Sequence, residues 1–420
     1  MTIMTEKIGI KAWLSQGKQV QITGMLLAFA LPFGKVYVPP FIALFLISLI
    51  ISPGFGRLEK PLGAKKFLFL LPVYYLLHVL GLLWTDNISY GLSDLEIKAS
   101  LLLFPLFFFL APSRYFDAAF LKKIVPAFLL GCFVSVVISG IFAFGMYLET
   151  KDICSFYYSN SSIFMHTSYL SMYIVFALYA LYALDFKRST FFYFLFGLTL
   201  FLVFYLNLLS SKAGLLSFIF VIAAILFEIL IKRKFRLILV FVVFPVMVYL
   251  ASSYFFPSSS SRMISAVSNL NQSEAVLNTT GESTADRILI WKVAYRLGMS
   301  QPFTGTGTGD VKDELIKTYV DNGLTYPAQL KLNAHNQFMQ SFVALGIPAL
   351  IILLISFIVP LWVSIRRKYW LYTVFILVFG FNILVESMLE VQAGIVFYAF
   401  WNSLLWVILA NGLNQKNQRV

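Results

Sequence analysis

Apolar runs of roughly 15 to 25 residues recur along the whole chain, and a run of this length suits a helix that crosses a lipid bilayer. Hydrophobic residues make up 60% of the 420 residues, charged residues make up 12%, and the mean hydropathy is +0.83. A soluble domain of this length does not bury so much apolar surface. The sequence therefore predicts an all-α polytopic membrane protein.

The apolar runs divide the chain into three parts. We predict about twelve transmembrane helices, with nine in residues 1–256, a loop domain in residues 257–335, and three helices with the C-terminus in residues 336–420. The predicted spans are 20–34, 38–52, 66–84, 97–112, 122–148, 167–184, 190–209, 212–231, 237–256, 336–362, 370–385 and 392–410.

The formal net charge of +13 arises mainly from basic residues that fall on one side of this topology. Most of the 32 Lys and Arg lie at the termini and in alternate connections, among them Arg57, Lys122, Lys123, Lys232, Arg233, Arg366 and Arg367. By the positive-inside rule this side is cytoplasmic, so both termini are predicted in the cytoplasm and the long loop on the outer side. The same placement leaves little for a nucleic-acid partner to bind.

The long polar loop contains two predicted helices. Residues 284–299, with Thr284 as N-cap, have the pattern of an amphipathic helix on the outer membrane face. Residues 310–319 form the second predicted helix. The glycine-rich stretch 305–309 between them indicates a turn, and it does not follow a strand as a nucleotide-binding loop would. Long loops commonly carry function.

Residues 333–346 return the chain to an apolar run and contain the strongest candidate for catalysis, His335. If a helix starts here with Asn333 as N-cap, His335 lies in its first turn, where the helix dipole favours a neutral imidazole. A neutral imidazole can act as a general base. Phe342 and Gly346 then share the face of His335. The alternative is a capped membrane helix with an interfacial histidine.

The cations of the outer side are few. Arg287 and Trp291 share a face of the first loop helix, whereas Arg296 points away from it, so we expect Arg287 to face the bundle. Its guanidinium can bind phosphate bidentately. Lys212, at the start of a span, is either an anchor at the lipid interface or a ligand for phosphate.

The acidic candidates are Glu386 and Glu390, one helical turn apart in the link between the last two spans. They either line a pocket and orient His335 or cap a helix in water. His78 and His166 are interpreted as packed or interfacial. With three histidines and two separated cysteines, Cys132 and Cys154, neither a metal site nor a disulfide framework is expected.

Three segments together resemble the O-antigen ligase family of membrane glycosyltransferases. His335 and Asn336, followed after nine residues by Gly346, resemble the family signature, although Ala349 departs from its last position. Arg287 and Trp291, followed by Pro302 and the glycines of 305–309, resemble its arginine-containing loop helix. Residues 210–214, with Lys212, resemble a segment in which the family commonly has arginine.

The resemblance implies that a glycan is moved from undecaprenyl diphosphate to lipid A-core oligosaccharide, at the periplasmic face of the bacterial inner membrane. His335 and Arg287 are the expected catalytic residues. The other expected site residues are Lys212, Asn336, Trp291, Arg296, Glu386 and Glu390. The expected reaction is inverting and uses neither a metal nor another cofactor. The implied partners are the lipid-linked donor, a glycan acceptor and membrane lipids.

Three other functions remain open on the sequence. An O-antigen polymerase often has glycine sixteen residues after a loop arginine, whereas Arg262, Arg287 and Arg296 are followed there by Asn278, Phe303 and Lys312. A protein O-oligosaccharyltransferase has the same chemistry with another acceptor. A transporter or flippase would carry ionisable groups near the bilayer midplane, and here the charges cluster at interfaces.

Overall fold

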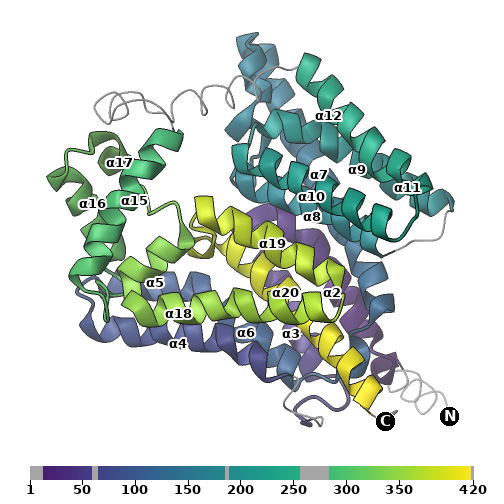
Figure 1. Ribbon diagram of the computed structural model, residues 1–420, viewed down its shortest axis with the longest axis horizontal. Helices are drawn as coiled ribbons and strands as arrows, with labels where there is room; N and C mark the ends of the chain where they lie inside the picture. The colour runs from purple at the N-terminus through teal and green to yellow at the C-terminus, as the bar shows by residue number, and fades with distance from the viewer. Residues whose placement is uncertain (1–12, 59–64, 185–188, 256–282, 418–420) are drawn as a thin grey trace, which may run out of the picture.

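The computed structural model describes residues 13–58, 65–184, 189–255 and 283–417, and every regular element in these ranges is a helix (Figure 1). Eight helical segments of the described chain are long and apolar enough to cross a membrane, and α8 (Thr167–Ala183) and α19 (Trp370–Val385) are shorter apolar helices. The protein is therefore an all-α, multi-pass membrane protein. The first part of the predicted loop domain, residues 256–282, and its Arg262 lie outside the described residues.

Each of the twelve predicted spans coincides with helix. The helices are α2 (Lys18–Ala30), α3 (Gly34–Ile50), α4 (Leu70–Leu80) between η3 (Lys66–Phe69) and η4 (Gly81–Trp84), α6 (Ser100–Leu110), α7 (Ala118–Thr150), α8 (Thr167–Ala183), α9 (Thr190–Leu209), α10 (Lys212–Ile231), α12 (Phe244–Phe255) after α11 (Arg236–Ile238) and η8 (Leu239–Val243), α18 (Gln337–Arg366), α19 (Trp370–Val385) and α20 (Gln392–Asn417).

The helices α2 and α3 form an antiparallel hairpin. Gln19 Nε2 donates to Ser52 Oγ at 2.9 Å, and Thr23 Oγ1 donates to Ser48 Oγ at 2.8 Å, so the start of α2 lies beside the end of α3. At the same end, Asn411 of α20 donates to the backbone of the segment before α7. The start of α2, the end of α3 and the end of α20 therefore lie at one end of the bundle.

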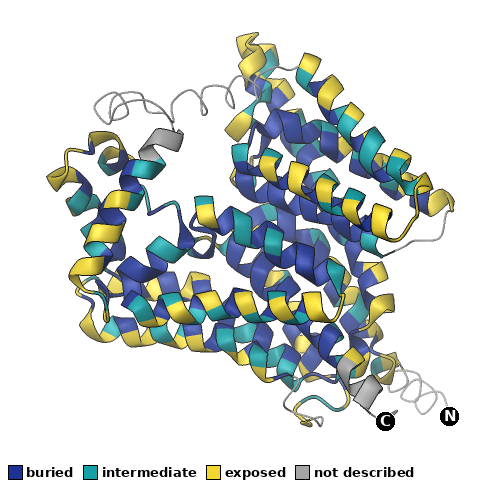
Figure 2. Ribbon diagram, in the orientation of Figure 1, coloured by how far each residue is buried: buried dark blue, intermediate teal, exposed yellow. Residues whose placement is uncertain are grey.

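The centre of the bundle is built from α8 and α20. All of α8 except its last residue is buried, and helices that are apolar on every face pack inside a bundle. Phe176 of α8 meets Trp401 of α20 edge to face, with ring centroids 5.0 Å apart. Figure 2 shows this buried centre, with exposed residues on the outer faces of α10, α12 and α18.

At the other end of the bundle lie α15 (Ser283–Ser300), α16 (Val311–Asp321) and α17 (Thr325–Gln329), together with α5 (Ile88–Lys98) (Figure 1). We call this the loop end. The two predicted loop helices are confirmed as α15 and α16, whereas α5 and α17 were not predicted. The helix α15 packs on α18 and buries Ile290 and Ala294, and its position at the outer membrane face stays a prediction.

A strap of residues 301–309 joins α15 and α16 and binds the membrane helices through its backbone. Thr306 N and Gly307 N donate to Val343 O and Ala344 O of α18, at 2.8 and 2.9 Å. Pro348 has no N–H to bond Ala344 O, so Gly307 takes the place of the missing helical donor. On its other side the strap reaches α4, where Thr308 Oγ1 donates to His78 O at 2.7 Å.

The helix α18 is kinked where the strap crosses it. Gly346 has φ +69°, outside the helical region, and Ile347 N donates to Pro302 O at 2.7 Å. A Cβ at position 346 would lie 2.5 Å from Pro302 O. Only glycine fits both the positive φ and this close approach, so the strap and α18 can meet here only because residue 346 is glycine.

Candidate active site

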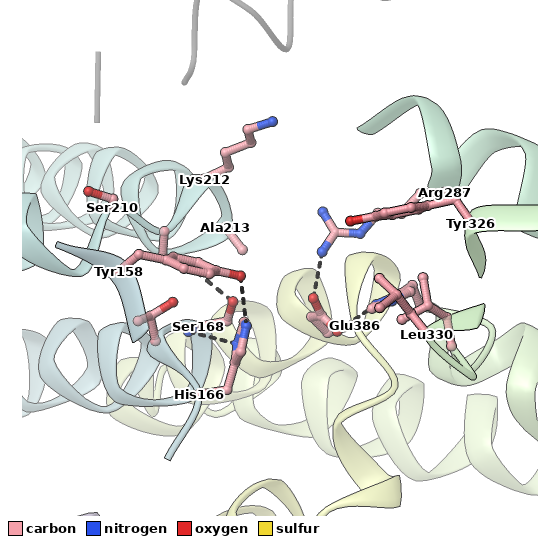
Figure 3. Close-up of a pocket in the computed structure, with 14 residues that line it drawn as sticks. Tyr158, His166, Ser168, Ser210, Lys212, Ala213, Arg287, Tyr326, Leu330 and Glu386 are labelled. Atoms are coloured by element: carbon pink, nitrogen blue, oxygen red, sulfur yellow. Dashed lines mark hydrogen bonds and ion pairs between the residues drawn. The ribbon is translucent and has the colours of Figure 1, made fainter. Parts of the chain in front are cut away.

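A cavity of about 370 Å³ opens at the loop end, between the first residues of α8, α10 and α15 and the link after α19 (Figure 3). Figure 3 shows Tyr158, His166 and Lys212 on one side and Arg287, Tyr326 and Glu386 on the other. Its lining residues are Tyr158, His166, Thr167, Ser168, Ser210, Ser211, Lys212, Ala213, Arg287, Tyr326, Leu330, Leu332, His335 and Glu386.

Three of the predicted residues form one hydrogen-bonded group in this cavity. Glu386 Oε2 lies 2.9 Å from His335 Nδ1, and Glu386 Oε1 lies 2.5 Å from an NH2 nitrogen of Arg287. The carboxylate therefore bridges the imidazole and the guanidinium. An ionised carboxylate only accepts hydrogen bonds, so Nδ1 carries a proton, and when the ring is neutral Nε2 is its unprotonated nitrogen.

The environment of Glu386 favours its ionised form. Burial by itself raises the pKa of a carboxyl group, but the hydrogen bond from His335 and the charges of His335 and Arg287 outweigh it and lower the pKa of Glu386 to about 2. Glu386 is therefore a carboxylate over the whole physiological pH range. It supplies one negative charge that orients two functional side chains.

The backbone before α18 differs from the prediction. Asn336, not Asn333, is the N-cap, and its side chain accepts from Met339 N at 3.0 Å. His335 precedes the helix with φ +45°, and its N–H donates to Asn333 Oδ1 at 3.0 Å. The predicted first-turn position of His335, and with it the shared face with Phe342, is wrong. An Asx turn at Asn333 sets the imidazole instead.

The start of α18 is fixed to the link that carries Glu386. Asn336 Nδ2 donates to Leu384 O at 2.9 Å, and Asn336 N donates to Ser387 Oγ at 3.2 Å. Gln337 Oε1 accepts from Leu389 N at 2.7 Å. These contacts fix His335 relative to Glu386, so Asn336 positions the two side chains. Asn336 itself does not line the cavity.

The cations at the cavity come from the starts of two helices. Ser211 caps α10 by accepting from Gly214 N at 3.1 Å, which places Lys212 at the first helical position as predicted. Arg287, 20% exposed, lies in the first turns of α15. Its Nε is buried and has no hydrogen-bond partner among the described residues, so only one corner of its guanidinium fork is used by Glu386.

The remaining predicted site residues lie away from the cavity lining. Trp291 Nε1 donates to His335 O at 3.4 Å and so supports the histidine from behind. Arg296 is exposed on the opposite face of α15, as the spacing predicts. Glu390 is paired with the buried Lys98 at 2.7 Å and lies outside the lining.

Sequence reasoning missed the wall formed by Tyr158, His166 and Ser168. Tyr158 begins the short helix η7 (Tyr158–Ser161), and His166 is the N-cap of α8, where its Nδ1 accepts from Ser168 N at 3.3 Å. The signal available in the sequence was a histidine just before an apolar run. A histidine is an unusual N-cap, and it was interpreted as interfacial.

The described residues contain no group of three or more His, Cys, Asp and Glu side chains that could hold a metal ion. The groups that line the cavity are two imidazoles, one bridging carboxylate, two cations and several hydroxyl groups.

Residues 194–354 match the family model described as O-antigen ligase. The matched segment includes Lys212, Arg287 and His335, and it ends before Glu386. No curated protein sequence matches the chain.

Proposed function

Because residues 194–354 match the O-antigen ligase family model, we propose that the protein moves a glycan from undecaprenyl diphosphate to lipid A-core oligosaccharide. The observation that carries this proposal is the bridge from Arg287 through Glu386 to His335 at a cavity that Lys212 also lines. One general base and two cations are the groups that such a transfer needs. A glycosyl diphosphate already has a good leaving group.

His335 acts as the base through Nε2. An acceptor hydroxyl attacks the anomeric carbon, its proton passes to Nε2, and the bond from that carbon to the diphosphate oxygen breaks. Glu386 holds Nδ1–H at 2.9 Å and stabilises the imidazolium that forms. Direct displacement of this kind inverts the anomeric centre.

The departing diphosphate is bound by Arg287 and Lys212. Arg287 gives one NH2 nitrogen to Glu386, and its side chain lines the cavity and is 20% exposed, so the guanidinium can also bind a phosphate oxygen. Lys212 adds a second charge at the first position of α10, where backbone N–H groups also favour an anion. This chemistry requires no metal or nucleotide.

We place the cavity on the periplasmic side of the inner membrane. The basic residues Lys232, Arg233, Arg366 and Arg367 lie at helix ends opposite the cavity and would face the cytoplasm, with both termini. The lipid-linked donor would then reach the cavity from the outer leaflet.

The test is glycan transfer in membranes that contain His335→Ala. We expect at least a roughly hundredfold loss of transfer, since a positioned base contributes about that much, with normal amounts of inserted protein. Transfer within a few fold of the unsubstituted protein would remove His335 from the mechanism. The unsubstituted protein should keep its activity in EDTA, and a loss restored by a divalent ion would overturn the metal-free mechanism.

The same assay separates the related activities. A purified lipid-linked glycan is offered with lipid A-core, with a second lipid-linked repeat, or with a protein acceptor. Transfer to lipid A-core alone supports the ligase, whereas a product on either other acceptor makes the protein a polymerase or a protein oligosaccharyltransferase. Glycan transport without transfer would make it a transporter or flippase.

A further inference from the structure

Tyr158 and His166 form a hydrogen-bonded pair on the cavity wall opposite Glu386 (Figure 3). Tyr158 Oη lies 3.1 Å from His166 Nε2, and the two rings meet edge to face with centroids 5.8 Å apart. On its other side, His166 Nδ1 accepts from Ser168 N at 3.3 Å. The mechanism above uses neither side chain.

The hydrogen bonds define where the protons lie. The Ser168 amide can only donate, so His166 Nδ1 is unprotonated and the neutral ring carries its proton on Nε2. That N–H donates to the Tyr158 oxygen, which turns the phenolic hydrogen away from the imidazole. The Tyr158 hydroxyl is thus arranged to donate a hydrogen bond to a ligand in the cavity.

The backbone at Tyr158 is strained and held in place. Tyr158 has φ +56°, and two more cavity residues, Ser210 and His335, have φ +48° and +45°. Residues other than glycine rarely adopt such angles, and they persist where surrounding contacts impose them, often at functional sites. Here Ser161 imposes the turn, since its Oγ donates to Tyr158 O at 2.6 Å and its own carbonyl accepts from Tyr205 Oη at 3.0 Å.

The pair differs in chemistry from the rest of the cavity. Arg287 and Lys212 are cations and suit a diphosphate, whereas Tyr158 and the neutral His166 offer an aromatic ring and an uncharged hydroxyl. An apolar ring face beside hydroxyl groups suits a sugar, whose own surface combines C–H groups and hydroxyls. The pair faces Glu386, which holds the base His335, so a sugar bound there lies beside the base.

We propose that Tyr158 and His166 bind the acceptor sugar and orient its reacting hydroxyl toward His335. This proposal rests on the proposed function. It means that the cavity wall formed by Tyr158 and His166 binds the acceptor rather than the diphosphate of the donor. Tyr158 makes the contact with the sugar, and His166 is a positioning residue that acts through Tyr158.

The test uses Tyr158→Phe, which removes only the hydroxyl, and His166→Asn, whose side-chain oxygen can still accept from Ser168 N. In proteoliposomes we expect each variant to raise the KM for lipid A-core about tenfold, the effect of losing roughly one hydrogen bond. The KM for the lipid-linked donor should stay within about twofold, and kcat should fall because the reacting hydroxyl is less well oriented. The double variant should resemble the stronger single variant, since the two residues act as one unit.

Two kinetic outcomes would overturn the proposal. A rise in the donor KM with an unchanged acceptor KM would place the diphosphate on this wall. A His166→Asn variant with normal KM values beside an impaired Tyr158→Phe would show that His166 does not act through Tyr158.

A binding arm separates this proposal from the proposed function. Equilibrium binding of lipid A-core and of undecaprenyl diphosphate is measured separately in the His335→Ala background, with and without Tyr158→Phe. If Tyr158→Phe weakens the binding of lipid A-core and leaves the binding of undecaprenyl diphosphate unchanged, Tyr158 binds the acceptor. This result stands even if the unsubstituted protein transfers nothing, and in that case only the proposed function fails. The acceptor role of Tyr158 and His166 is overturned if Tyr158→Phe leaves lipid A-core binding unchanged. It is also overturned if the His335→Ala protein with Tyr158 intact does not bind lipid A-core.

Discussion

Two carboxylates four residues apart in the link after α19, Glu386 and Glu390, are each paired with a cation in very different surroundings. Glu386 bridges Arg287 and His335, whose side chains are 20% and 22% exposed at the cavity. Glu390 pairs with Lys98, which is completely buried and also bonds Asp94 at 2.5 Å. One pair is open to a ligand and the other is sealed inside the protein.

The two carboxylates also differ in the direction in which their pKa values move. Burial raises the pKa of Glu390, because Lys98 and a hydrogen bond from Gln337 compensate only in part. Burial of Glu386 is outweighed by His335 and Arg287, so its pKa falls to about 2. Similar ion pairs therefore serve different purposes. The open pair is arranged for chemistry, and the sealed pair holds the link on which the open pair depends.

The largest expected effect is that of Glu386→Gln. An amide can still accept from His335 Nδ1, but it cannot stabilise the imidazolium, so transfer should fall by roughly two to four orders of magnitude. Glu390→Gln in the same link is the control and should keep transfer within about tenfold. The measurement is initial rate per inserted protein. Equal losses in the two variants would show that the link acts only as a structural unit.

Lys98→Met should affect stability rather than chemistry. It leaves Asp94 and Glu390 buried without their shared cation, and removing one partner of a buried ion pair costs about 3–5 kcal/mol. We expect a clear fall in the melting temperature of the purified protein, partly recovered when Glu390→Gln is added. An unchanged melting temperature would contradict the structural role given to this pair.

Arg287→Lys should lower transfer by roughly ten- to a hundredfold. A lysine keeps the charge beside Glu386 and loses the fork that a phosphate needs. Arg296→Ala, nine residues along the same helix on its exposed face, is the matched control and should leave the rate unchanged. Full activity of Arg287→Lys would show that a point charge is sufficient at the cavity.

The smallest expected effect is on the pH dependence of thermal stability. A depressed carboxyl pKa contributes stability that is present above its unfolded value, about 4.3, and is lost as the pH falls through the folded value of about 2. The difference in thermal stability between the unsubstituted protein and Glu386→Gln should therefore be constant from pH 8 to about 5 and shrink below that. Glu390, with its raised pKa, contributes no such loss. A difference that shrank already at pH 6 would contradict this assignment.

Hydropathy alone was sufficient to predict the helices of the bundle, because a segment as apolar as α8 or α18 can satisfy its backbone in lipid only as a helix. His335, Arg287 and Lys212 were candidates from their positions in the sequence, and the family resemblance gave them their expected roles. The spacing predicted His335 inside a helix, because an asparagine at position 333 can either cap a helix or form an Asx turn. The sequence pattern does not distinguish the two, and the structure has the Asx turn.

Other parts of the site depend on contacts that no local pattern encodes. Lys98 meets Glu390 across 292 residues of sequence, and Arg287 meets Glu386 across 99. Tyr158 lies in a short 3₁₀ turn without any periodicity. These two ion pairs, and the place of Tyr158 on the cavity wall, are visible only in the folded structure.

The strap has a consequence for how this protein can diversify. Because residues 301–309 are bonded to α18 and α4, the chain beyond them, in α16 and α17, is attached to a fixed platform. A chimera that exchanges residues 311–324 with those of another family member would leave Arg287 and the kink of α18 undisturbed. Inserting a single residue within the strap would shift the membrane helices to which it is bonded. Natural variation in length should therefore occur in residues 311–324 rather than in residues 301–309.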